Sequence, residues 1–451
     1  MALSLWALAA YIAIILVWNV VLKRNIGEAM GIGWIVVLLF GGSGIFDLFL
    51  KSMAFASTTE TVYAAQAFVF MAYVMTKTGL VNRLVDILNS ALGKLAGGAG
   101  YIATCASALM GLISGSGSGN AASVGAVAIP WMQKSNWPKD LPATVIAGNA
   151  GLGADLPPSS SMFVLAGMAV VAAQVNMGQL YMALLTGGAW TFVYRIILIY
   201  YFVKRYNIKP VPPELIKPFM ETMKNGWTSL LMFLGILIPV GLTMGPVGEY
   251  LESVKSFGSN AVNSLSIIVW IPVLISWIAI LEGWKYLPKS ASGWYDFIGG
   301  AATRYVIVGA TIFFAMGAGD VLTRLGLAED MLTLMQSFNF SPWLMISLVG
   351  ILVCIVGGPL TSTATVVAVG PVSFSALVSV GVPGPTAAAV ILIWAATEGA
   401  SPPNSAPIFI ASGIANTDPV KVFVPCILYY LLPLWIIGIL IALRILPSVV
   451  L

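Results

Sequence analysis

The chain has 451 residues, of which 59% are hydrophobic and 8% are charged, and its formal net charge is +4. With so few charged residues, the chain has too little polar surface for a soluble protein. The composition therefore excludes a soluble enzyme and indicates a protein of the lipid bilayer. The sequence has no histidine, no Walker loop, no nucleophile elbow and no histidine-containing triad. We therefore expect no enzymatic activity, no direct use of ATP and no binding of nucleic acid.

Ten apolar runs along the chain are long enough, at about 20 residues, to cross a bilayer. In chain order they are residues 5–22, 31–50, 61–76, 140–171, 179–203, 227–246, 263–283, 305–322, 385–415 and 422–447. Two more stretches, residues 98–133 and 340–382, are each interrupted by a glycine-rich break, and we interpret them as re-entrant hairpins. With the N-terminus outside, 16 of the 21 Lys and Arg residues fall on the cytoplasmic side, which predicts that orientation.

One pair of breaks occurs twice in the chain. In the first copy a glycine- and serine-rich break at 114–120 is followed by a break with a Pro-Pro pair at 151–160. In the second copy the corresponding breaks lie at 357–365 and 397–405. Under the predicted orientation the spans before the two hairpins run in opposite directions, so the copies are predicted to be inverted repeats. Broken apolar helices at matching places in two halves indicate the binding site of a carrier.

These features divide the chain into five predicted parts. They are N-terminal scaffold helices (1–60), a first repeat (61–203), a cytoplasmic linker (204–226), further scaffold helices (227–304) and a second repeat (305–451). The amphipathic stretches 78–97 and 324–339 are predicted to be arms that lie along the two membrane faces. The expected fold class is an all-α polytopic membrane protein with two re-entrant hairpins and two broken helices.

The breaks predict what binds there. Inside a bilayer, backbone N–H and C=O groups freed by a break cost several kcal/mol each unless they line a cavity or bind a ligand. Carbonyl groups at the C-terminal ends of half-helices suit Na⁺, and N–H groups at N-terminal ends suit a carboxylate. Serine and threonine hydroxyls add neutral oxygens, and glycine allows the backbone to approach a ligand closely. We therefore expect cations and an organic anion at the four breaks.

The motifs Ser-Gly-Ser-Gly-Asn at 116–120 and Gly-Ala-Asp-Leu-Pro-Pro-Ser at 153–159 resemble those of a known family. It is the large membrane subunit of the tripartite ATP-independent periplasmic (TRAP) transporters, within the ion-transporter superfamily. The resemblance implies uptake of a small organic acid, driven by a Na⁺ gradient without a cofactor, by elevator movement of an inverted-repeat transport domain. It also implies a bacterial or archaeal cytoplasmic membrane, and as partners a small four-helix membrane subunit and a periplasmic solute-binding protein.

Carried over residue by residue, the resemblance implies two Na⁺ sites. The first Na⁺ site has Ser116, Ser118, Gly153, Leu156 and Pro158. The second has Gly357, Gly358, Thr397 and Ser401. The solute is predicted to bind the polar side chains of the breaks, which are Ser116, Ser118, Asn120, Ser159, Ser160, Thr361, Ser362, Thr363, Asn404 and Ser405.

Two carboxylates depart from the family's pattern. Asp155 stands where the family usually has an apolar residue, and Glu398 stands where a glycine is expected. An ionisable group near the middle of a bilayer is by default a functional candidate, so both are predicted to ligate Na⁺ or to bind a coupled proton. This leaves two alternatives to the organic-anion carrier: an antiporter or exporter, coupled to protons or Na⁺, that uses Asp155 and Glu398, and a channel or structural membrane subunit.

Overall fold

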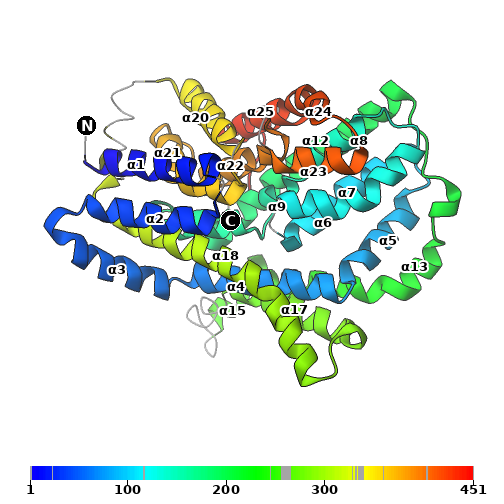
Figure 1. Cartoon of the computed structure of the whole chain (residues 1–451), viewed down its shortest axis with the longest axis horizontal. Coiled ribbons are helices and arrows are strands. Elements are labelled where there is room, and N and C mark those ends of the chain that lie inside the picture. Colours follow the sequence, from blue (N-terminus) through cyan, green and yellow to red (C-terminus); the bar gives the residue numbers. More distant parts are fainter. Residues whose placement is uncertain are drawn as a thin grey trace.

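The computed structural model describes residues 3–22, 24–114, 117–243, 245–254, 266–327, 329–330, 333, 340–358, 360–402 and 405–449. Every regular element in these ranges is a helix, and no strand occurs among them (Figure 1). Five of the described helices are long and apolar enough to cross a membrane. The predicted all-α polytopic class is thereby confirmed.

The N-terminal region contains one helix more than the sequence predicted. α1 (Leu3–Leu16) continues into the π-helical η1 (Val17–Val21) and is followed by α2 (Ile26–Leu39), η2 (Gly42–Gly44) and α3 (Ile45–Thr58). The predicted single span 31–50 is therefore wrong, because α2 and α3 are separate helices. The chain turns at Gly41–Gly44, where Gly42 has φ +54°, a left-handed conformation that glycine adopts without steric cost.

The first predicted arm is present as a helix that bends away from the span before it. α4 (Glu60–Lys77) and α5 (Leu80–Leu92) differ in direction by 64°. The bend falls at Gly79, which has φ +68° and separates the two helices. Leu80, Val81 and Leu84 are buried on one face of α5, as the amphipathic pattern of this stretch requires.

Both predicted hairpins are pairs of helices in mutual contact. The first consists of α6 (Gly98–Ser114) and α7 (Gly117–Lys134), and the second of α20 (Pro342–Gly357) and α21 (Ser362–Ser379). The first predicted broken helix is interrupted at its Pro-Pro pair, and the second is interrupted between Ala400 and Ala406. The first consists of α8 (Leu141–Asn149), α9 (Leu152–Asp155), α10 (Ser160–Gly167) and α11 (Ala169–Ala172), and the second of α22 (Gly384–Ala395), η6 (Ala396–Ala400) and α23 (Ala406–Ala415).

The remaining helices connect and support these elements. They are α12 (Met177–Tyr206), η3 (Pro213–Leu215), α13 (Phe219–Gly226), η4 (Trp227–Phe233), α14 (Leu234–Thr243), α15 (Gly245–Ser253), α17 (Ile267–Glu282), η5 (Trp284–Tyr286), α18 (Ala291–Arg324), α24 (Pro419–Cys426), η7 (Ile427–Leu431) and α25 (Leu432–Ala442). The predicted boundary between 304 and 305 falls inside α18, so the second scaffold segment and the second repeat share one continuous helix. Most of the predicted arm 324–339 lies outside the described residues.

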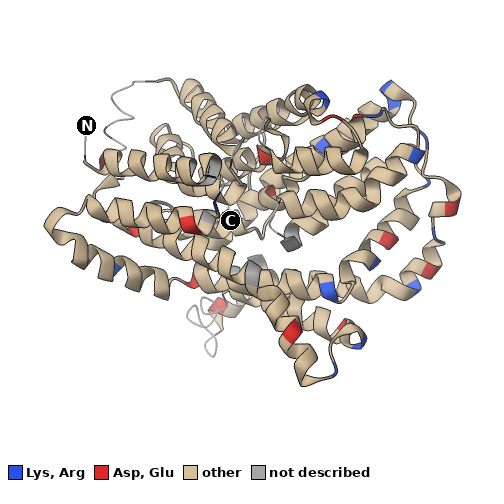
Figure 2. Cartoon of the chain, in the orientation of Figure 1, with Lys and Arg blue, Asp and Glu red and all other residues tan. Residues whose placement is uncertain are grey.

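α18 and α4 connect the N-terminal helices to the broken helices, and α1 also contacts α21 of the second hairpin. α18 contacts α2, α3 and α4, whereas α10 reaches both α4 and α18 from the side of the broken helices (Figure 1). Figure 2 shows most Lys and Arg residues in the right half of the view, around the connection between α12 and α13. Such gathering of basic residues at one end is what the positive-inside rule requires of a cytoplasmic face.

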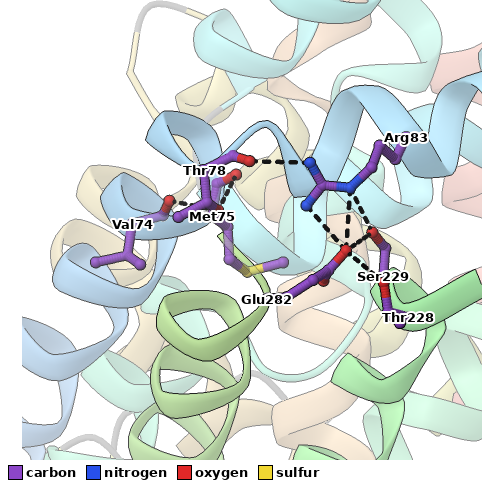
Figure 3. A network of polar contacts seen from close by, with 7 residues as sticks. All are labelled: Val74, Met75, Thr78, Arg83, Thr228, Ser229 and Glu282. Atoms are coloured by element: carbon purple, nitrogen blue, oxygen red, sulfur yellow. Dashed lines mark hydrogen bonds and ion pairs between the residues drawn. The ribbon is translucent and has the colours of Figure 1, made fainter. Parts of the chain in front are cut away.

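A polar cluster ties the arm α5 to the neighbouring helices (Figure 3). Arg83 of α5 pairs with Glu282 at the end of α17 at 2.9 Å, and its Nε donates to Ser229 Oγ of η4 at 2.9 Å. Its Nη1 donates to the carbonyl oxygen of Thr78, at the bend before α5, at 3.0 Å. Thr228 also donates to Glu282, so one carboxylate gathers three elements around the bend.

Candidate functional site

The four breaks meet at the centre of the molecule. η6 contacts α7, α8, α9 and α21, while α10 contacts α21 and α23 contacts α7. The two broken helices cross at their glycines. A Cβ on Gly151 would lie 1.9 Å from the carbonyl oxygen of Ala396, and a Cβ on Gly399 would lie 2.5 Å from that of Ala147. Only glycine permits this approach, so these positions bring the two breaks together.

The starts of α7 and α21 occupy matching places in the two copies. Gly117 and Ser362 are 245 residues apart, the same separation as Pro157 and Pro402 of the Pro-Pro pairs. Between these helix starts lies the carboxylate of Glu398, which accepts a hydrogen bond from the Ser362 backbone N–H. A Cβ on Gly117 would lie 2.3 Å from Glu398 Oε1, so the backbone of α7 also borders this carboxylate.

Hydroxyl groups surround the start of α21. Thr361 caps the helix, because its side-chain oxygen accepts from the Ala364 backbone N–H at 3.3 Å. The Thr363 hydroxyl lies 3.3 Å from Ser160 Oγ and 3.2 Å from Ser161 Oγ, both at the start of α10. The structure therefore brings predicted solute-binding residues of the two copies together across the break.

Neutral oxygens gather beside the predicted second cation site. A Cβ on Gly358 would lie 3.7 Å from the Ser401 carbonyl oxygen and 3.8 Å from that of Pro402. A Cβ on Gly357 would lie 3.7 Å from Thr365 Oγ1. Carbonyl and hydroxyl oxygens are the ligands that suit a dehydrated Na⁺, so these residues fit the ion.

Within the same break, side chains hold the unwound backbone. Ser401 Oγ donates to the Thr397 carbonyl oxygen at 2.8 Å, and Thr397 Oγ1 donates to that of Trp394 at 2.7 Å. Ser405 Oγ donates to the Gly399 carbonyl oxygen at 3.0 Å. Three of the predicted hydroxyls therefore satisfy backbone carbonyls, as a buried break requires.

The first break is built differently. Gly153 lies against Gly111 of α6, so close that a Cβ on Gly153 would lie 2.9 Å from the Gly111 Cα. Asn120 Nδ2 donates to the carbonyl oxygens of Ser107 and Ala150 at 2.9 and 3.3 Å. In the part of the chain that the structure describes, its Oδ1 has no partner, and neither does Oδ1 of the fully buried Asn149. These two amide oxygens are neutral groups that can ligate Na⁺ or accept a hydrogen bond from a solute N–H or O–H.

The backbone after Asp155 carries the other predicted residues of this break. Leu156 is half-buried and lies against α12, where a Cβ on Gly188 would meet its side chain at 2.8 Å. Pro158 is buried, and the peptide bond between Pro157 and Pro158 is cis. Ser159 caps α10 by accepting from the Met162 backbone N–H at 3.2 Å.

Asp155 points away from the helix starts. Its Oδ2 pairs with Arg195 Nη1 of α12 at 3.0 Å and accepts from Thr191 Oγ1 at 2.8 Å. Both charged side chains are 0% exposed. Arg195 thus neutralises Asp155 from α12, while in the described residues the second carboxylate oxygen, Oδ1, has no hydrogen-bond partner.

Sequence reasoning did not reach several residues of the site. It missed Gly117, Asn149 and Thr365, whose only signal was their place inside or beside a predicted break. Among the residues that it named, Ser118 is half-buried in the first turn of α7. Ser116 and Asn404 lie outside the described residues.

Comparison with known proteins identifies relatives over almost the whole chain. Residues 5–447 match the model of the family described as "Tripartite ATP-independent periplasmic transporter, DctM component". The C4-dicarboxylate TRAP transporter large permease protein of Pseudomonas aeruginosa is 23% identical over 85% of this chain and 84% of its own length. The isethionate TRAP transporter permease protein of Oleidesulfovibrio alaskensis is 24% identical over 91% of this chain, which spans 60% of that protein.

A solved structure shares the fold. The crystal structure of the YdaH transporter of Alcanivorax borkumensis aligns with a TM-score of 0.66 and 14% sequence identity, covering 90% of this chain and 89% of that one. At this identity the likeness concerns the arrangement of helices alone.

Proposed function

The chain belongs to the family of DctM components of tripartite ATP-independent periplasmic transporters, and from this membership we propose that it is the membrane subunit that carries a small organic acid into the cell. The observation that supports this proposal is the meeting of four helix breaks at one point, with two helix starts facing inward. Polar backbone at membrane depth is tolerated where it serves a ligand, which is why we place the solute here.

We further propose that Na⁺ drives the uptake. The support is the set of neutral oxygens around Gly357 and Gly358, which come from Ser401, Pro402 and Thr365. On the first side, the buried amide oxygens of Asn120 and Asn149 are free to ligate a second ion. The engagement of Asp155 with Arg195 gives no support to an antiporter that would use Asp155 as its exchanging group.

Family membership also suggests the partners, the membrane and the movement of this protein. The relatives whose names identify them as large permease proteins suggest a small membrane subunit and a periplasmic binding protein as partners. We propose a bacterial inner membrane, with the basic end that Figure 2 shows on the cytoplasmic side and the N-terminus outside. We also propose that the hairpins and broken helices move together against α1, α2, α14 and α17 as an elevator.

Na⁺ binding to the purified protein tests the proposal without knowledge of the solute. We expect the unfolding temperature to rise with NaCl and not with the same concentration of choline chloride at constant pH, because Na⁺ that binds only the folded state stabilises it. The variant Thr365→Val removes one neutral oxygen and is expected to weaken the effect, whereas Thr333→Val, on an exposed side chain, leaves it unchanged. Equal stabilisation by both salts would contradict Na⁺ coupling and would favour coupling to protons.

A further inference from the structure

Glu398 is a buried carboxylate at the centre of the four breaks. Its residue is 7% exposed, and its Oε2 accepts the backbone N–H of Ser362, the first residue of α21. Its Oε1 borders Gly117, the first residue of α7, and the backbone of Gly117 also interacts with the carboxylate. One side chain therefore connects the two helix starts that belong to different copies of the repeat.

The charges at this point balance without a basic side chain. Each helix start carries about half of a positive elementary charge, so two of them offset one carboxylate. Both helices are 18 residues long, which is enough for the full effect at their first turns. Of the ion pairs found in the described residues, none includes Glu398. The chain thus provides its own anion at the place where N–H groups would otherwise receive one.

We propose that Glu398 selects the charge of the transported solute: its carboxylate fills the anion position between the starts of α7 and α21, so the solute presents an ammonium group to this point and not a second carboxylate. The inference rests on the proposed function only in placing the solute at the four breaks. A carboxylate brought beside Glu398 would meet like charge in a buried setting, where such repulsion is strong. An ammonium group would complete the coordination of the Glu398 oxygens.

A neighbouring group supports a ligand at this point. Ser362 is 4% exposed, and its hydroxyl lies beside the Glu398 carboxylate but makes no hydrogen bond of good geometry within the described residues. Buried hydroxyls without partners are uncommon and call for a bound group. The solute class that fits is an amino acid with one carboxylate and one ammonium group, held at the ammonium end by Glu398 and Ser362.

Rescue by a small anion tests whether Glu398 fills an anion position. Glu398→Ala opens space between the helix starts, and we expect 100 mM sodium formate to raise the unfolding temperature of this variant by at least about 2 °C relative to the same concentration of NaCl. Wild type, in which the position is filled, is expected to show no such rise. Glu398→Gln keeps the volume of the side chain and excludes formate, so it serves as the matched control. Formamide, which has the shape of formate without its charge, is expected to have no effect on any of the three.

The outcomes separate clearly. A formate response of equal size in wild type and Glu398→Ala overturns the proposal, and so does no response in a Glu398→Ala variant that remains folded. If Glu398→Ala does not fold even with formate, the test uses the unfolding temperature of Glu398→Gln instead. We expect this temperature to lie below that of wild type, because the helix starts lose their anion, and an unchanged unfolding temperature overturns the proposal.

Solute charge is tested with three four-carbon acids of matched length. For wild type we expect 4-aminobutyrate to bind more tightly than 4-hydroxybutyrate, and succinate to bind most weakly. In Glu398→Gln the affinity for succinate is expected to rise by about tenfold or more relative to 4-aminobutyrate. If wild type binds succinate more tightly than the other two acids, the proposal is overturned. If none of the three acids binds, the formate experiment alone decides whether Glu398 fills the anion position. Because that experiment measures stability, it keeps its meaning even if the protein proves not to transport organic acids.

Discussion

Replacing Arg195 by methionine removes the partner of a fully buried carboxylate. Arg195 and Asp155 are both 0% exposed, and the distance between Nη1 and Oδ2 is 3.0 Å. Methionine fills most of the volume of the arginine side chain but leaves Asp155 with only the Thr191 hydroxyl as a side-chain partner. The perturbation therefore isolates one buried charge and creates little empty space.

The size of the effect follows from burial. At 3.0 Å and an effective dielectric constant of about 20, two unit charges attract by about 5 kcal/mol. Removing one partner of a buried pair typically costs about 3–5 kcal/mol, because the other charge is left uncompensated. With an unfolding entropy of about 2.1 cal/mol/K per residue, this corresponds to a fall in unfolding temperature of roughly 3–5 °C.

Thermal unfolding of the purified protein measures this cost. The double variant Asp155→Asn with Arg195→Met removes both charges and is expected to recover at least half of the loss, since no charge stays buried. Lys217→Met is the control, because the Lys217–Asp86 pair has a similar distance of 2.7 Å but side chains that are 59% and 41% exposed. We expect that control to change the unfolding temperature by less than about 1 °C. If Arg195→Met behaved like Lys217→Met, the view of Asp155 as a buried and otherwise uncompensated charge would be refuted.

Three further predictions concern the arm, the crossing of the breaks and the movement. Arg83→Gln breaks the ion pair with Glu282 that Figure 3 shows, and we expect the free energy of unfolding, measured by thermal unfolding, to fall by about 1.5–3 kcal/mol. An unfolding free energy equal to that of wild type would mean that the cluster does not stabilise the bend. Gly151→Ala puts a Cβ 1.9 Å from the Ala396 carbonyl oxygen and is expected to abolish the yield of folded protein. Gly413→Ala in α23, where a Cβ meets nothing within 4 Å, is expected to keep or slightly raise stability, and equal yields of both variants would contradict the close crossing. A disulfide engineered between α1 and α21, which are in contact, is expected to stop uptake until it is reduced, and full uptake in the cross-linked protein would rule out the elevator movement.

Local features of the chain were predictable because their causes are local. Apolar runs, glycine-rich stretches and Pro-Pro pairs act on the backbone of their own segment, so both hairpins and both broken helices follow from the sequence. The errors also have local causes. The span 31–50 failed because hydropathy averages across the turn at Gly42, and the boundary at 304 failed because α18 continues through a stretch of weaker hydropathy.

Composition and local pattern were enough to predict that this protein lies in a membrane, that its helices break at four matched places and that these breaks are its candidate site. What each carboxylate contacts depends on the packing of distant helices. Asp155 and Glu398 read alike in the sequence, as acidic residues beside Pro-Pro pairs. The fold turns Asp155 toward Arg195 on α12 and places Glu398 between the starts of α7 and α21. Their partners lie tens of residues or more away along the chain, and electrostatic interaction depends on distance in space, which no local pattern records.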